Sequence, residues 1–264
     1  MQEMFCFQCQ QTAHNTGCNG KAGVCGKKAD TANYQDELLG ALVGLARAVQ
    51  AGTATERTDE LMLKGLFTTI TNVNFNNETI LQIKNEIEKE KAAVSPAHYD
   101  DYDMAGLWRA EEDVRSLKSL ILFGLKGMAA YAYHARVLGR TDPAVNRWFY
   151  EALAAIGEEK NTDELLQLVL KTGEVNLTCM ALLDAANTET YGDPVPTTVP
   201  LTIEKGPFIV VSGHDLHDLQ LLLEQTAGKG INIYTHSEML PAHGYPELKK
   251  YPHLKGNFGT GWQN

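Results

Sequence analysis

The sequence predicts a mainly α-helical protein that leads into the start of a parallel α/β domain. Two observations predict this fold. Apolar residues recur at helical spacing from Leu38 to Ala186, and beyond Pro200 short apolar runs of strand length alternate with a leucine-rich helical segment. Between these regions lies the proline-rich segment 191–200, which is typical of a connection between domains. We therefore expect a helical-bundle domain over residues 1–192 and an incomplete α/β domain over residues 193–264.

Apolar residues three and four positions apart mark the helices of the first region. The predicted helices cover residues 38–51, 61–70, 80–91, 111–138, 143–153, 163–170 and 174–186. Asn76 or Asn77 is suited to cap the third helix. Asp142 followed by Pro143 is a common helix start, because proline fits the first helical position. Helices joined by such short connections favour antiparallel bundles.

The second region reads as a strand–helix–strand unit. Residues 208–211 (FIVV) and 231–234 (INIY) are apolar runs of strand length, and the segment 215–226 between them repeats leucines at helical spacing. This pattern is the start of a parallel, Rossmann-like α/β domain. A parallel sheet is usually covered on both faces and has several strands, yet only these two are evident, so we expect the sheet to be incomplete.

Composition and charge narrow the class of protein. The 264 residues are 44% hydrophobic and 21% charged, which is typical of a soluble globular protein. A net charge of -10 opposes binding to nucleic acid or anionic lipid. The N-terminus lacks a signal sequence, and the longest apolar run, 120–125, is far shorter than the roughly 20 residues of a membrane span. We therefore expect a cytoplasmic protein without nucleic-acid or membrane partners.

The amino-terminal segment concentrates cysteines. Four of the five cysteines lie within it, with gaps of two, eight and six residues: Cys6, Cys9, Cys18 and Cys25. In a reducing compartment such spacing indicates metal ligands rather than disulfides. The long gaps differ from the paired C-x2-C motifs of many zinc sites, and a cubane cluster takes one thiolate per iron, so iron–sulfur is favoured over zinc. His14 is interpreted as a solvated loop residue, and Cys179 as a packed core residue.

A second group of polar residues follows the two predicted strands. His214 and Asp215 come just after the first strand, and Glu238 follows the second. Since the carboxyl ends of parallel strands share one edge of the sheet, His214 and Glu238 should face one crevice. From the residues alone they could ligate a transition metal or act as an acid/base pair. They could also do no more than cap the helices that follow the strands. The nearby histidines, any of which could donate protons, are His217, His236 and His243.

Several segments resemble one known family in order along the chain. They are FCFQCQQTA, GVCGK, VVSGHDLHDL, LLEQTAGKGINIYTHSEMLPAHGYPELKKYPHLKGN and FGTGWQN. These segments resemble the N-terminal half of the hybrid-cluster proteins, also called prismane proteins or hydroxylamine reductases. The resemblance implies that Cys6, Cys9, Cys18 and Cys25 hold a [4Fe-4S] cluster, or the [2Fe-2S] cluster of other members. The gap of eight residues between Cys9 and Cys18, the shorter of the spacings found in the family, is more similar to the cubane members.

The resemblance also implies a second, hybrid iron–sulfur–oxygen cluster as the active site. His214 matches the family histidine of the SGHD motif, and Glu238 matches the glutamate of the EMLPAHGYP motif. The further cysteines and the second glutamate of that cluster are absent from this sequence, since family members are about twice as long. We therefore expect either a piece of a longer protein or a split protein whose C-terminal half is a separate partner chain.

The implied activity is reduction of hydroxylamine to ammonia and water, or of nitric oxide, under nitrosative stress. Electrons would come from an external donor, a reductase or a ferredoxin-like protein, through the N-terminal cluster. His236 and His243 are weaker candidates for proton handling, and Gln10 or Thr12 could tune the cluster by hydrogen bonding. The alternative is an electron-transfer or scaffold module with one cluster and no catalysis of its own.

Overall fold

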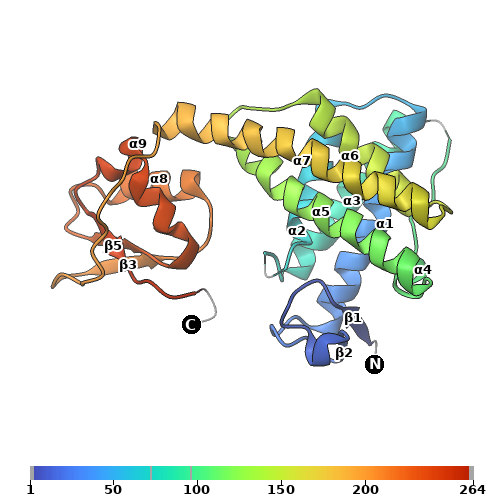
Figure 1. Ribbon diagram of the computed structural model, residues 1–264, viewed down its shortest axis with the longest axis horizontal. Helices are drawn as coiled ribbons and strands as arrows, with labels where there is room; N and C mark the ends of the chain where they lie inside the picture. The colour runs from blue at the N-terminus through green and yellow to red at the C-terminus, as the bar shows by residue number, and fades with distance from the viewer. Residues whose placement is uncertain (1–2, 72, 96, 262–264) are drawn as a thin grey trace. The chain divides into compact units, whose positions relative to one another are not determined.

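The computed structural model describes residues 3–71, 73–95 and 97–261, so the last three residues of the FGTGWQN segment and of the predicted 193–264 domain lie outside the described chain. The elements, shown in Figure 1, follow one another in this order: β1 (Met4–Cys6), η1 (Ala13–Asn15), β2 (Cys18–Gly20), α1 (Ala29–Ala51), α2 (Glu56–Thr68), α3 (Asn77–Val94), α4 (Ala105–Trp108), α5 (Glu112–Val137), α6 (Pro143–Ile156), α7 (Thr162–Tyr191), β3 (Phe208–Val211), α8 (Leu216–Thr226), β4 (Asn232–Thr235), η2 (Ser237–Gly244), α9 (Pro246–Lys249) and β5 (Leu254–Asn257). The described chain is thus mainly helical with a small parallel sheet, as the sequence predicts.

The chain forms two compact units. The first unit contains residues up to 133 together with 141–180, and the second contains 134–140 together with residues from 181 onward. Helices α5 and α7 therefore contribute residues to both units. The predicted boundary after residue 192 falls within the second unit, and the domain division itself stays a prediction.

Helix α1 forms the centre of the first unit. Leu38, Leu42 and Leu45 on this helix are fully buried among side chains of the neighbouring helices. Two of its glycines permit close approach of the segment before α4. The amide of Tyr102 donates to the carbonyl of Gly40 (3.1 Å), and a Cβ at Gly40 would overlap the carbonyl oxygen of Tyr102. Gly44 similarly faces Asp100 and Lys91.

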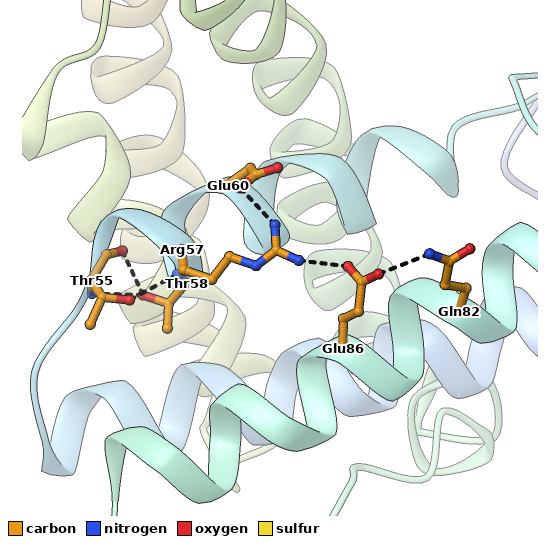
Figure 2. Close-up of polar contacts among 6 residues, drawn as sticks. All are labelled: Thr55, Arg57, Thr58, Glu60, Gln82 and Glu86. Carbon is orange, nitrogen blue, oxygen red and sulfur yellow. Dashed lines mark hydrogen bonds and ion pairs between the residues drawn. The ribbon is translucent and has the colours of Figure 1, made fainter.

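Helices α2 and α3 illustrate how local sequence sets helix ends. Thr55 caps α2: its hydroxyl accepts the amide proton of Thr58 (3.1 Å), and the Thr58 hydroxyl accepts that of Thr55 (2.9 Å), as Figure 2 shows. Arg57 of α2 forms an ion pair with Glu60 of the same helix and another with Glu86 of α3, each at 2.7 Å, and the second pair joins the two helices. Asn76 caps α3, in agreement with the sequence prediction.

Helix α7 corrects one prediction. The sequence suggests two helices, 163–170 and 174–186, whereas the structure has one continuous helix. Gly173, which lies between the two predicted helices, weakens a helix by about 1 kcal/mol relative to alanine. The adjacent Thr172 is buried, however, and its hydroxyl donates to the carbonyl of Leu168 (2.7 Å) and accepts from the indole of Trp148 (3.3 Å). Packing against α6 therefore overrides the local preference.

The second unit contains a three-stranded parallel sheet in the order β3-β4-β5. The first two strands agree with the prediction, with β4 starting one residue later, but β5 was not evident from the sequence. Its Gly256 faces the carbonyl of Pro200, where a Cβ would overlap, so a glycine occupies a strand position. Asp215 caps α8 by accepting from His217 (2.8 Å) and Asp218 (3.0 Å). None of the helices in the described ranges is long and apolar enough to cross a membrane.

Candidate functional site

The cysteine loop, residues 6–25, begins with a small hairpin. Strands β1 and β2 pair antiparallel, and their register sets Cys6 opposite Cys18. Cys9 begins a turn in which the amide of Thr12 donates to its carbonyl (3.1 Å). Cys25 lies in a second turn, which the hydrogen bond from the Gly23 amide to the Lys27 carbonyl (2.8 Å) closes. The hairpin therefore sets two of the four predicted ligands, Cys6 and Cys18, opposite each other, and the other two, Cys9 and Cys25, lie in turns of the same loop.

The sulfur atoms do not form a closed ligand set as they stand. All five cysteines are free thiols, and among the described residues no three His, Cys, Asp or Glu side chains converge on one point suitable for a metal ion. Cys18 and Cys25 do border the same space, because a Cβ at Gly23 would lie 3.7 Å from the Cys18 Cβ and 3.6 Å from the Cys25 Sγ. A cluster held by this loop would draw the remaining thiols inward.

Hydrogen bonds favour the thiolate form of Cys18. Burial raises the pKa of this thiol, but backbone N–H groups of Val24 and Ala13, the Thr12 hydroxyl and the charge of Lys27 more than offset burial, so the pKa is lowered. The Ala13 amide lies 3.4 Å from the sulfur, and the Thr12 hydroxyl oxygen lies 3.8 Å away. Thr12, rather than the exposed Gln10, is thus the polar side chain beside a cysteine sulfur. Thiolate is the form that binds metal.

Buried charges lie beneath the cysteine loop. A cavity of about 20 Å³ is lined by Cys6 of the loop and by Lys27, Asp36 and Lys126. Lys27 is 2% exposed and Lys126 is 6% exposed. Burial lowers the pKa of Lys126 to about 8, although the charge of Asp36 opposes this. Burial raises the pKa of Asp36 to about 6, against the hydrogen bond from Trp108 and the charges of both lysines.

The donors and the charge of this region fit an iron–sulfur cluster. Two buried ammonium groups face one half-buried carboxyl group, which leaves an excess of positive charge next to the Cys6 thiol. A buried charge is costly unless a compensating charge lies close by. Four thiolates around iron carry net negative charge and are the usual ligands of such clusters. The loop and the lysines beneath it are therefore chemically complementary to that group.

The second candidate site lies at the carboxyl edge of the parallel sheet. β3 and β4 pair in register, with Val211 opposite Thr235, and the His236 amide donates to the Val211 carbonyl (2.8 Å). This register brings the two segments that follow the strands together. His214 Nε2 forms an ion pair with Glu238 Oε2, and both side chains line a cavity of about 150 Å³. The sequence expectation that these two residues face one crevice agrees with this geometry.

The other histidines of the second unit differ in environment. His217 lines the same cavity as His214 and Glu238. His236 lies at the sheet edge, where its ring nitrogens are 3.0 Å from the Ser212 hydroxyl and 3.2 Å from that of Thr260. His243 is buried, its Nε2 lies 2.8 Å from the Thr235 hydroxyl, and burial lowers its pKa despite a hydrogen bond with the Gly256 backbone. Of these three histidines, His217 is therefore the one that shares a cavity with the candidate pair.

Sequence reasoning missed two residues of this cavity. His134 Nδ1 lies 3.3 Å from Asp215 Oδ2. The hydrogen bond from His134 lowers the pKa of Asp215 to about 2, against burial. Tyr191 is fully buried, its hydroxyl has no hydrogen-bond partner within the described chain, and burial raises its pKa to about 12. Both come from helices remote in sequence, and the only local signal was a histidine within the apolar segment AAYAYHA.

Residues 4–264 match the Prismane/CO dehydrogenase family. A protein named hydroxylamine reductase from Solidesulfovibrio magneticus is 51% identical over 99% of this chain, and one from Methanocella arvoryzae is 47% identical over the same share. Each match covers 54% of the relative, so the chain spans about half the length of these proteins. Among solved structures, a carbon monoxide dehydrogenase from Thermococcus sp. AM4 shares 16% identity with a TM-score of 0.31, over 95% of this chain and 42% of its own, which is too distant to inform the site. The match over almost all of the sequence shows that the chain belongs to the Prismane/CO dehydrogenase family.

Proposed function

We propose that the chain is the N-terminal half of a hydroxylamine reductase, with an iron–sulfur electron relay in the helical domain and part of the active site in a Rossmann-like domain. Relatives named hydroxylamine reductase support the reaction class. The observation that carries the proposal is the contact between His214 and Glu238 at the carboxyl edge of the sheet. An imidazole and a carboxylate are both ligands for iron, and both side chains are largely exposed at this edge of the sheet.

Cys6, Cys9, Cys18 and Cys25 would hold the relay, a [4Fe-4S] cluster. The hybrid iron–sulfur–oxygen cluster, when bound, supplies a low-valent iron site that accepts the oxygen of the N–O bond. His214 and Glu238 would be two of its ligands, and the remaining ligands would come from outside residues 1–264. As iron ligands, His214 would bind as the neutral imidazole and Glu238 as the carboxylate.

The reaction is the reduction of hydroxylamine by two electrons and two protons, which breaks the N–O bond and gives ammonia and water. The electrons would come from a reductase or a ferredoxin-like donor in the cytoplasm. His236 and His243 are weaker candidates for handling the protons. Nitric oxide would be a second substrate, and its reduction would serve defence against nitrosative stress.

The test is an anaerobic iron and sulfide count combined with activity. The complete protein containing this sequence should carry more iron than one cubane cluster, and should reduce hydroxylamine. His214→Ala and Glu238→Ala should each abolish activity and remove the second cluster's iron while keeping the iron of the relay. His98→Ala, at an exposed histidine of the first unit, is the matched control and should change neither.

A contrary result has a definite meaning. If the complete protein holds the iron of a single cluster, about four atoms, it is an electron-transfer or scaffold module instead. If it holds zinc and lacks visible absorption, the cysteine loop is a structural zinc site.

A further inference from the structure

Lys126 and Lys27 are withdrawn from water on the inner side of the cysteine loop. The ammonium group of Lys126 donates to the side-chain oxygen of Gln8 (2.9 Å) and to the carbonyl of Thr69 (3.1 Å). That of Lys27 donates to the side-chain oxygen of Gln35 (2.6 Å). These acceptors are uncharged, and neither lysine forms an ion pair within residues 3–71, 73–95 and 97–261.

The nearest carboxyl group does not cancel both charges. Asp36 lines the same small cavity, and its oxygen accepts from the indole of Trp108 (3.1 Å). One carboxylate against two ammonium groups leaves at least one positive charge unmatched. The aromatic side chains of Phe7, Phe123 and Trp108 surround this cavity and keep its dielectric constant low.

The uncompensated charge faces Cys6, one of the four candidate ligands. Cys6 lines the cavity together with both lysines, and Gln8, which holds the Lys126 ammonium, lies between Cys6 and Cys9. A group bound by these thiols becomes one unit more negative when it accepts an electron. A fixed positive charge in an apolar setting stabilises that reduced form more than the oxidised form.

We propose that Lys126 and Lys27 are positioning residues that raise the reduction potential of the cluster held by the cysteine loop. This inference rests on the proposed relay cluster. It assigns the lysines a function beyond folding: they make the relay easier to reduce and hence a better acceptor for the external donor. Lys126 has a second effect, because its bond to Gln8 fixes the segment between Cys6 and Cys9.

The experiment measures the midpoint potential of the cluster, reconstituted anaerobically in the full chain, by redox titration followed through visible absorption and electron paramagnetic resonance. Lys126→Met should make reduction about tenfold less favourable, which for a one-electron couple is a shift of about 59 mV to lower potential. Lys27→Met should shift it in the same direction. Lys89→Met removes the same charge at an exposed position of α3 and should leave the potential unchanged.

The outcomes separate the two proposals. A cluster that loads normally in Lys126→Met and Lys27→Met but keeps the wild-type potential would overturn the lysine inference and leave the relay intact. If Lys126→Met fails to load, Lys126→Gln, which is neutral but retains amide donors for Gln8, provides the measurement. A wild-type chain that acquires no cluster at all would overturn both the relay and the inference.

Discussion

Single buried side chains determine much of the electrostatics of the first unit. Asp36 shows this well, because burial raises its pKa to about 6 in the folded chain from an ordinary value of 3.8. Between these two pH values the folded chain keeps a proton that the unfolded chain releases. The stabilisation from this group is therefore complete below about pH 4 and is lost as the pH rises through 6.

Asp36→Asn should remove this part of the pH dependence in the metal-free chain. Between pH 4 and 8 the free energy of unfolding of the wild type should fall relative to the variant by on the order of 2 kcal/mol, because the amide cannot ionise. Urea unfolding across this range measures the difference. Asp193→Asn, at an exposed position, is the matched control. A constant difference between wild type and Asp36→Asn would contradict the assignment.

At the scale of elements, close approaches between backbone segments decide which positions tolerate a side chain. Gly40 of α1 and Gly173 of α7 are both interior helical glycines, but their surroundings differ. The carbonyl of Tyr102 occupies the space beside Gly40, whereas nothing lies within 4 Å of a Cβ at Gly173.

Alanine should therefore have opposite effects at the two sites. Gly40→Ala should destabilise the chain by about 3 kcal/mol, because the backbone at Tyr102 must shift and its bond to the Gly40 carbonyl is strained. Gly173→Ala should stabilise it by about 0.5–1 kcal/mol through helix propensity. Denaturant midpoints compare the two variants directly. Equal effects would mean that α1 and the Tyr102 segment are not packed as described.

The same scale separates what the sequence could predict from what it could not. Caps at Asn76, Asp142 and Asp215 were predictable, because the capping side chain and the helix start are adjacent in sequence. The continuity of α7 could not be predicted, because it depends on packing against another helix, where the indole of Trp148 donates to the Thr172 hydroxyl. Strand β5 was missed because LKGN lacks an apolar pattern. Its Gly256 is required by a contact that is distant in sequence, since a Cβ there would overlap the carbonyl oxygen of Pro200.

The candidate sites divide in the same way. His214 and Glu238 follow strands, so a parallel sheet alone brings them together, and the motif was enough. The four cysteines are close in sequence, so they too could be identified as candidate ligands from the sequence alone. His134, Tyr191 and Lys126 reach their sites from distant helices, and no local pattern reports such contacts. Their roles required the structure.

For the molecule as a whole, a bound cluster should add to the stability of the first unit. A group that binds the folded but not the unfolded chain stabilises it by mass action. The anaerobically loaded chain should melt roughly 5–10 °C above the metal-free chain, and chelation should reverse the gain. Scanning calorimetry under argon measures both forms.

Cysteine variants provide the controls for this experiment. Cys6→Ser should abolish the difference between loaded and metal-free chains, because it removes a proposed ligand. Cys179→Ala should lower both melting temperatures and preserve their difference, since Cys179 is fully buried and its thiol pKa is raised to about 12 by burial. Loss of the difference in Cys179→Ala, or its persistence in Cys6→Ser, would count against the four-cysteine assignment.

The candidate cysteine ligands and Lys126 lie far apart in the sequence, which has a consequence for biogenesis. All four thiols leave the ribosome within a short stretch, so this nascent segment can close on itself at a small entropic cost. The ammonium group beneath it is synthesised about a hundred residues later, and reaches Gln8 only when α5 docks. A cofactor inserted early would therefore have Lys27 beside it in the chain but would meet the charge of Lys126 late, during maturation of the helical core.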